Sequence, residues 1–265
     1  MPSGPSKIYV FRGGNFFNSG PAGYDPYRKL KIILFIILAL YLYHLYLSGT
    51  QTMIAQFLQT AILIPIILIS LTFHEFSHAL MADFLGDPTP RHMGRLSLNP
   101  MNHLDLFGTI LLFFSNFGWA KPVPVDPRNF RVPDRAMMSV ALAGPLSNIV
   151  LAFLGGVFCK VFTMTQSGIP PIPLLQTTLT GVTLIIFIKM NLGLAFFNLI
   201  PLPPLDGSKV LSFFLSPRLR FRYQEYEPMG PIFLILFVSF GLVGKLLELP
   251  IQFSFELIFK SLSLI

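Results

Sequence analysis

Residues 53–82 read MIAQFLQTAILIPIILISLTFHEFSHALMA, and this stretch decides how the rest of the chain is interpreted. No acidic or basic side chain precedes His74 in it, so it is long and apolar enough to cross a bilayer as a helix, for which about 20 residues suffice. His74, Glu75 and His78 then place three ionisable side chains within five positions. Because a charged residue inside a membrane helix costs roughly 2.5–3.5 kcal/mol on insertion scales, such residues predict a functional site.

The composition of the whole chain is that of a membrane protein. Of its 265 residues, 53% are hydrophobic and only 12% are charged, whereas soluble domains carry about a quarter charged residues. Most lysines and arginines behind the net charge of +7 lie between apolar segments, where they act as topology signals, so we expect no nucleic-acid partner. A single cysteine, Cys159, excludes an internal disulfide.

Charge-free runs occur along most of the chain and predict an all-α polytopic membrane protein with five to six transmembrane helices. The final run, residues 249–265, carries Glu256 and Lys260, so it is either a sixth span or an interfacial helix. The other predicted spans are residues 30–48, 53–82, 136–159, 169–188 with a continuation to 205, and 228–244.

The apolar run 106–118 is too short to cross the bilayer and has basic residues on both flanks. A re-entrant segment keeps both flanks on one side of the membrane, and non-helical backbone at that depth is possible where protein covers it. The flanking residues 95–99 and 121–125 suit short β-strands on the cytoplasmic side. We hypothesise that they clamp an extended peptide by strand addition, the alternative being ordinary interfacial loops.

The basic residues also predict the orientation of the chain. With a re-entrant segment, the basic clusters fall on the side of the N-terminus, whereas loops 48–52 and 165–173 carry no charge. By the positive-inside rule, the N-terminus is cytoplasmic in a multi-pass protein of the cell (inner) membrane. Residues 1–28 are expected to form a loosely ordered cytoplasmic tail ahead of a membrane domain at 29–265.

The spacing of His74 and His78 is typical of a metal site. Side chains at i and i+4 share one face of a helix, and Glu75 beside them can reach a water on the metal, which is the H-E-x-x-H pattern of zinc peptidases. The alternative is that Glu75 marks the membrane interface and the histidines cap it. A catalytic zinc needs a third protein ligand and one open position. The candidates for that ligand are His92, His103, Asp105 and Asp206.

For His92 and His103, a surface role in the cytoplasmic loop is the simpler interpretation, the alternative for His103, near Asp105, being to support a metal ligand. Other polar or helix-distorting residues lie inside the predicted spans. Gly144-Pro145 predicts a kink that frees a backbone carbonyl. Asn148, one turn further on, either donates to an oxyanion or hydrogen-bonds a neighbouring helix, and the sequence does not separate these roles. Lys189 is expected to point inward, to a carbonyl or carboxylate.

Three motifs, taken together, resemble the site-2 protease family of intramembrane zinc metalloproteases, specifically its short prokaryotic members without a PDZ domain. They are His74-Glu75-Phe76-Ser77-His78, then Ala143-Gly144-Pro145-Leu146-Ser147-Asn148, then Asn198-x-x-Pro201 leading into Leu205-Asp206-Gly207. The resemblance covers a catalytic core of about residues 53–210. It implies one zinc ion held by His74, His78 and Asp206, with Glu75 as general base. It also implies that Gly144 and Pro145 shape the substrate channel, with Asn148 and Asn198 hydrogen-bonding near the scissile bond.

The resulting prediction is a zinc endopeptidase that hydrolyses peptide bonds in the transmembrane segments of single-span membrane proteins, with its active site toward the cytoplasm. One alternative is a metal-dependent membrane transporter, because histidine and carboxylate groups at membrane depth also suit ion pathways. No pair of inverted repeats typical of transporters is evident in the sequence. Another is a catalytically silent receptor of the same fold, although Glu75 and the implied ligands are all present.

Overall fold

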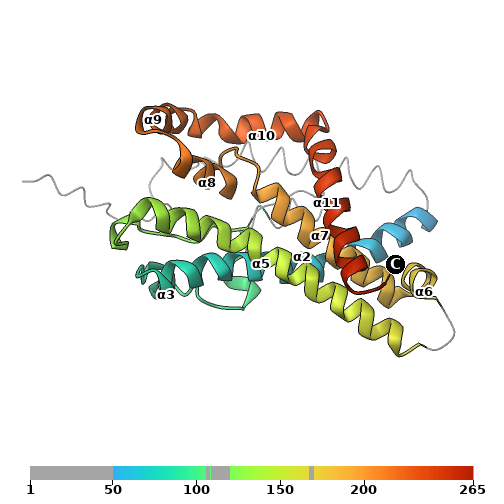
Figure 1. The fold of residues 1–265 in the computed structure, drawn as a ribbon. Helices are drawn as coiled ribbons and strands as arrows, with labels where there is room; N and C mark the ends of the chain where they lie inside the picture. The colour runs from blue at the N-terminus through green and yellow to red at the C-terminus, as the bar shows by residue number, and fades with distance from the viewer. Residues whose placement is uncertain (1–49, 106–107, 109–119, 167–169, 265) are drawn as a thin grey trace, which may run out of the picture. The chain divides into compact units, whose positions relative to one another are not determined.

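The described part of the chain is almost entirely helical in the computed structural model (Figure 1). The structure describes residues 50–105, 108, 120–166 and 170–264. Contacts divide the chain into two units, Met1–Met53 and Ile54–Ile265, and nearly all of the described residues belong to the second. The elements are α2 (Thr50–Phe84), α3 (Thr89–His92), η1 (Pro100–Asn102), η2 (Pro127–Asn129), α5 (Pro133–Met164), α6 (Pro171–Thr177), α7 (Leu179–Asn198), α8 (Asp206–Phe214), α9 (Pro217–Glu225), η3 (Glu227–Met229), α10 (Gly230–Ser239) and α11 (Leu242–Ser261).

Three of the described helices are long and apolar enough to cross a membrane: Ala61–Phe84 within α2, α5 and α7. A fourth span results if the stretch Glu227–Ser239 and α11, which are bent by 77° at a short break, are counted as one. The predicted span 30–48 lies outside the described residues, and so does the predicted re-entrant segment 106–118 apart from Gly108. The described residues therefore give three to four of the five to six predicted spans.

Two of the predicted spans are each divided into two helices. The run from Ile169 divides at Thr178, whose backbone is extended and whose Oγ1 accepts a hydrogen bond from Gly181 N at 3.1 Å, so α7 begins afresh there. The predicted span 228–244 is interrupted at Gly241, where α10 and α11 meet (Figure 1). Gly241 has a φ of +67°, a left-handed conformation that glycine adopts without steric cost.

The two predicted β-strands are not formed. Residues 95–99 and 121–125 have no strand assignment, and the bridge between Leu104 and Ala120 is the one isolated β-bridge of the described residues. Pro122 and Pro124 lack the backbone N–H that a ladder requires, so the second segment cannot pair regularly. Both segments are irregular backbone beside α2.

Glycines allow the long helices to pack closely. On α5, a Cβ at Gly155 would lie 2.8 Å from Ile188 Cγ1 of α7, and one at Gly156 would lie 2.5 Å from Ile258 Cγ2 of α11. Lipid tails are as apolar as the helix surfaces, so membrane helices associate largely through close packing, and small residues permit that close approach. The buried core between α5, α6, α7 and α11 contains Ala152, Cys159, Leu175, Ile188, Leu192, Ile258, Phe259 and Leu264.

Lys189 does not point inward as predicted. Its side chain is exposed on α7, and its Nζ lies 5.2 Å from the centroid of the Phe255 ring on α11. A lysine over an aromatic face is attracted by the ring quadrupole, which offers the ammonium a partner other than a carbonyl or carboxylate.

Candidate metal centre

Two imidazoles project from one face of α2. His74 and His78 are one helical turn apart and are 4% and 7% exposed. Their rings meet edge to face, with centroids 4.6 Å apart and an interplanar angle of 85°, and their Nε2 atoms are 3.0 Å apart. The predicted spacing therefore brings two nitrogen donors to one point, as expected for side chains at i and i+4.

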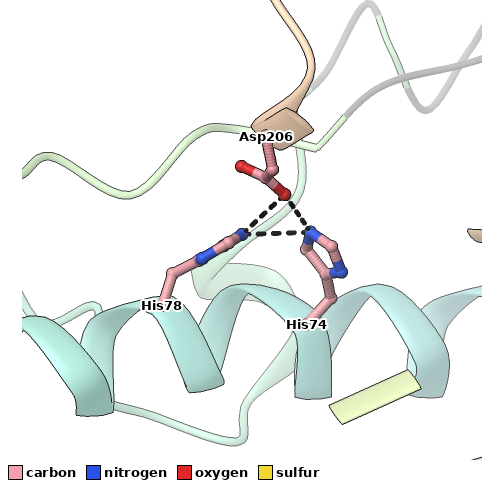
Figure 2. Close-up of side chains that lie close together, drawn as sticks. All are labelled: His74, His78 and Asp206. Atoms are coloured by element: carbon pink, nitrogen blue, oxygen red, sulfur yellow. Dashed lines mark hydrogen bonds and ion pairs between the residues drawn. The ribbon is translucent and has the colours of Figure 1, made fainter. Parts of the chain in front are cut away.

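Asp206 reaches the same point from a distant part of the chain. Its Oδ2 lies 3.1 Å from Nε2 of His74 and 3.2 Å from Nε2 of His78 (Figure 2). Asp206 is the first residue of α8, which follows the proline-rich turn after α7. Gly207 lies so close to the backbone of Leu199 and Ile200 that a Cβ there would collide with it, and this tight turn directs the carboxylate toward α2.

The three donor atoms fit a zinc ion. Two imidazole nitrogens and one carboxylate oxygen form a ligand set found in catalytic zinc sites. Zinc bonds to such atoms are about 2.0–2.2 Å long, so neighbouring ligands of a tetrahedral ion lie about 3.3 Å apart. The separations here, from 3.0 to 3.2 Å, agree with that value to within a few tenths of an ångström. Among the described residues, His74, His78 and Asp206 form the one group of three or more potential ligands.

The carboxyl of Asp206 is held in its charged form. Burial alone would raise its pKa, but the side-chain contacts with His74 and His78, and the positive charge that these rings carry when protonated, lower the pKa well below the ordinary range of aspartate. A carboxylate that stays ionised is the form that ligates a cation.

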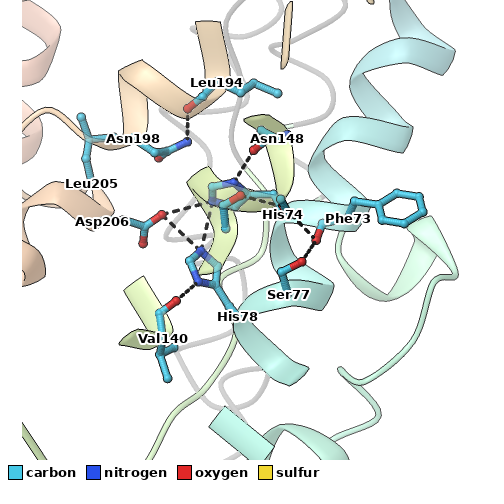
Figure 3. Close-up of polar contacts among 12 residues, drawn as sticks. Phe73, His74, Ser77, His78, Val140, Asn148, Leu194, Asn198, Leu205 and Asp206 are labelled. Carbon is cyan, nitrogen blue, oxygen red and sulfur yellow. Dashed lines mark hydrogen bonds and ion pairs between the residues drawn. The ribbon is translucent and has the colours of Figure 1, made fainter. Parts of the chain in front are cut away.

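Both histidines are oriented by contacts of their other ring nitrogen (Figure 3). Nδ1 of His74 lies 2.6 Å from Oδ1 of Asn148, and Nδ1 of His78 lies 2.7 Å from the carbonyl oxygen of Val140. Because these oxygens accept hydrogen bonds, each Nδ1 carries the proton and each Nε2 presents its lone pair to the centre. Such contacts fix the tautomer and the ring orientation of metal-binding histidines.

Asn148 has no hydrogen-bonding capacity left for an oxyanion in this arrangement. Its Nδ2 donates to the carbonyl of Ser70 at 3.2 Å and to Oδ1 of Asn191 at 2.9 Å, and its side chain is fully buried. Of the two roles left open by the sequence, the geometry thus matches contact between helices, with His74 among its partners. Asn191 was not singled out from the sequence, although an amide inside an apolar span is a signal for it.

Gly144 and Pro145 lie inside α5, which continues through them. A Cβ at Gly144 would lie 2.5 Å from Nε2 of His78 and 2.6 Å from Nε2 of His74, so only glycine lets α5 approach the two rings this closely. Pro145 has no N–H and therefore leaves the carbonyl of Ala141 without its helical partner, and Ala141 lines the cavity at the centre.

A cavity of about 470 Å³ opens at the three donors. Glu75 lines it and is 9% exposed, and Asn198 lines it while its Nδ2 donates to Leu194 of the same helix at 3.0 Å. Most of the remaining wall is apolar. It includes Leu71, Ala120, Pro122, Val123, Val125, Leu194, Phe197, Pro204, Leu205, Pro231, Leu234 and Ile235, with Lys209 at its edge.

The other candidate ligands lie elsewhere. His92 is exposed at the end of α3, and Asp105 accepts a hydrogen bond from Gly108 N at 2.8 Å. His103 is only 1% exposed, and its Nε2 lies 2.7 Å from the carbonyl of Ser97, so the surface role predicted for it is wrong. The loop around it folds inward, which the polar composition of the loop did not signal.

Fold and site together define a helical membrane metalloprotein with a glutamate beside two of three potential zinc ligands. Residues 160–239, which include Asn198 and Asp206, match the family model "Peptidase family M50". The chain is 43% identical over 178 residues to YwhC of Bacillus subtilis (strain 168), which is named as a zinc metalloprotease, and the match covers 67% of this chain and 80% of that protein. The chain therefore belongs to peptidase family M50, the site-2 protease family of zinc metalloproteases.

A more distant relative carries a similar name. Rip2 of Mycobacterium tuberculosis (strain ATCC 25618 / H37Rv), also named as a zinc metalloprotease, is 28% identical over 194 residues, which cover 69% of this chain and 71% of that protein. No solved structure matches the chain.

Proposed function

We propose that this protein is an intramembrane zinc endopeptidase that cleaves the transmembrane segments of single-span membrane proteins. The observation that supports this most strongly is the convergence of His74, His78 and Asp206 beside Glu75, in a mostly apolar cavity between helices long enough to cross a bilayer. One zinc ion per chain, held by these three residues, would polarise the scissile carbonyl and activate a water molecule.

Glu75 is the residue placed to move protons. It follows His74 directly, lines the cavity and is largely shielded from solvent. We assign it the role of general base, which takes a proton from the attacking water and then passes it to the leaving amine. Asn148 and Val140 hold the two imidazoles, so their roles in the reaction are positional.

The wall of the cavity suits an unwound peptide. The carbonyls of a substrate helix are bonded within the helix, so part of that helix must unwind before a carbonyl can reach the centre. On the wall, the backbone of Val123 makes no hydrogen bond to the described residues, and it lies between two prolines. We propose that its N–H and C=O bind a substrate backbone, which is a shorter form of the clamp proposed for residues 121–125.

Asn198 lines the same cavity, and its Nδ2 donates to the carbonyl of Leu194 in its own helix. We assign it to substrate contact near the scissile bond.

The basic segments around residues 91–95, 121–135 and 218–222 belong to the side from which Asp206 enters, and by the positive-inside rule this side faces the cytoplasm of the cell (inner) membrane.

The test is to purify the protein, measure its zinc and assay cleavage of single-span substrates with the wild type and with Glu75→Gln. An endopeptidase keeps about one zinc per chain in both forms and loses cleavage in the variant by at least about 100-fold. Unchanged cleavage in Glu75→Gln would remove Glu75 from the mechanism. Zinc transport without cleavage would favour a transporter, and zinc binding with neither activity would favour a silent receptor.

A further inference from the structure

Arg95 is a buried cation in the loop that follows α3. Its side chain belongs to a residue only 5% exposed, and among the described residues it has no carboxylate within ion-pair distance. Its guanidinium is instead surrounded by backbone carbonyls. One nitrogen donates to the carbonyls of Lys121 and Pro122, each at 2.7 Å, and the other donates to the carbonyl of Asn102.

Burying a guanidinium among neutral groups is costly unless its donors are all used. Burial lowers the pKa of Arg95, and the negative charge of Glu75 acts in the opposite direction. Arginine presents donors in a rigid planar fork, which can join carbonyls of different segments in one fixed geometry. Arg95 joins residues on both sides of the segment 106–118.

The segment that Arg95 joins forms part of the cavity wall. Ala120, Pro122 and Val123 line the cavity that also holds Glu75. Two prolines prevent a regular ladder there. Among the described residues, the backbone contacts of this wall are the bridge from Ala120 to Leu104 and the bond from Lys121 N to the carbonyl of His103 at 2.8 Å. The guanidinium supplies the two further attachments, directly beside Val123.

We propose that Arg95 is a positioning residue for catalysis: it fixes the wall 120–123 of the cavity that holds the ligands, so that the backbone of Val123 meets the substrate in register. This inference rests on the proposed endopeptidase function. It assigns to Arg95 no contact with substrate or metal, and it predicts a loss of substrate positioning without a loss of zinc.

The first test does not depend on activity. A nitroxide is attached to Lys121→Cys, since the native Cys159 is fully buried and does not compete for the label. The electron paramagnetic resonance spectrum should report a label of restricted motion, and Arg95→Gln should increase its mobility. Arg91→Gln is the matched control, because Arg91 is an exposed arginine in the preceding helix α3 whose ion-pair partner is Asp83. Equal spectra for Arg95→Gln and Arg91→Gln would overturn the proposal.

The second test measures cleavage of a single-span substrate. Arg95→Gln should lower kcat/KM by about tenfold or more, mainly through KM, with zinc content unchanged, whereas Arg91→Gln should stay within about twofold of wild type. Arg95→Lys keeps the positive charge but not the planar set of guanidinium donors, so it should give an intermediate loss of kcat/KM. Guanidinium ion added to Arg95→Ala should restore part of the activity.

The outcomes separate this inference from the function on which it rests. Wild-type protein that cleaves no membrane substrate contradicts the endopeptidase function, while the spin-label result still decides whether Arg95 fixes the wall. Wild-type kinetics in Arg95→Gln, or a loss of zinc in proportion to activity, contradicts the positioning role. If Arg95→Gln does not fold, Arg95→Lys provides the same comparison of KM, zinc and label mobility.

Discussion

Gly144 on α5 lies so close to His78 on α2 that a methyl group at position 144 would be 2.5 Å from the imidazole Nε2. That separation is well below van der Waals contact, and the atom concerned is one of the three potential ligands. The geometry of the metal centre thus depends on the absence of a side chain from a helix that contributes no ligand.

Replacing Gly144 by alanine should displace the imidazoles from the metal position. We expect zinc content to fall and cleavage to drop by about 100-fold, because a displacement of about 1 Å at a reacting centre has effects of that size. Zinc analysis and a cleavage assay check this. Gly244→Ala is the matched control, since a Cβ there has nothing within 4 Å. A Gly144→Ala protein with normal zinc and turnover would contradict the close approach of α5.

Removing the Asn148 side-chain contacts should weaken metal binding. Asn148→Leu leaves Nδ1 of His74 without its 2.6 Å partner, and we expect zinc affinity to fall by about 10- to 100-fold. Competition with a chromogenic chelator measures this. Asn191→Leu keeps the contact between Asn148 and His74 and removes the outer acceptor, together with the bond from Asn191 Nδ2 to the carbonyl of Phe187, so its effect on zinc affinity should be smaller. Equal losses in the two variants would argue against a specific role for Asn148.

The choice of third ligand can be tested directly. Asp206→Ala should lose most of its zinc, because Oδ2 of Asp206 is the one carboxylate oxygen that the described residues place beside both Nε2 atoms. His92→Ala should keep its zinc, because His92 is exposed and distant from the group. Both are measured by metal analysis after dialysis against chelator, followed by recovery with added zinc. Retention in Asp206→Ala would show that another residue completes the site.

Asn198→Ala should separate substrate contact from metal binding. Asn198 lines the cavity but donates within its own helix and touches no ligand, so zinc content should be unchanged. We expect kcat/KM to fall by about tenfold, from the lost interaction with the substrate. The comparison with Asn148→Leu is informative, because the two asparagines are predicted to differ in their effect on zinc. Loss of metal in Asn198→Ala would contradict this division of roles.

Asp87 is a fully buried carboxylate that holds the loops beside the site together. It accepts hydrogen bonds from Thr89 N and Oγ1, Asp126 N and Asn129 Nδ2, which connect the end of α2 to the segment before α5. In Asp87→Asn, one carboxylate oxygen is replaced by an NH2 group, which cannot accept the hydrogen bonds that these donors make. The substitution should lower the free energy of unfolding at pH 7 by about 2–4 kcal/mol, as measured by denaturation in detergent.

The pH dependence of that loss follows from the direction of the pKa shift. Burial raises the pKa of Asp87, but the hydrogen bonds from Thr89, Asp126 and Asn129 outweigh it and lower the pKa below its ordinary value. A depressed folded-state pKa gives a stabilisation that is present above the unfolded value, about 3.9, and disappears as pH falls through the lower folded value. The difference in the free energy of unfolding between the wild type and Asp87→Asn should therefore become smaller as the pH falls. The exposed Asp134 offers a control, since Asp134→Asn should cost no more than about 1 kcal/mol.

The sequence predicted those parts of the site that depend on local geometry. The i, i+4 spacing of His74 and His78 fixes their common face in any helix. The spacing of residues could not identify Asp206 as the third ligand, because no spacing rule relates residues that are far apart along the chain. Three other candidates for that ligand remained open until the resemblance to the family favoured Asp206. Gly144 was interpreted as part of a kink, since a close approach by another helix leaves no periodic signal in the sequence.

The misjudged parts depend on tertiary contacts. The two strands flanking 106–118 had a suitable alternation, but the prolines and the guanidinium of Arg95 replace ladder pairing there. His103 was taken for a surface residue because it lies in the predicted cytoplasmic loop, whereas it is buried there with its Nε2 close to the carbonyl of Ser97. The role of Val140 is carried by a backbone carbonyl, which any residue type could supply.

His74 and Asp206 are separated by 132 positions, and this distance has a consequence for how the protein is made. When α2 emerges from the ribosome and enters the bilayer, it brings only two of the three ligands. The third follows after α5 and α7 have been synthesised and inserted. Ion uptake with full coordination is therefore a late event of biogenesis, and a nascent chain arrested after α7 would hold metal with two imidazoles only. Until then, Glu75 lies beside two imidazoles without the carboxylate of Asp206.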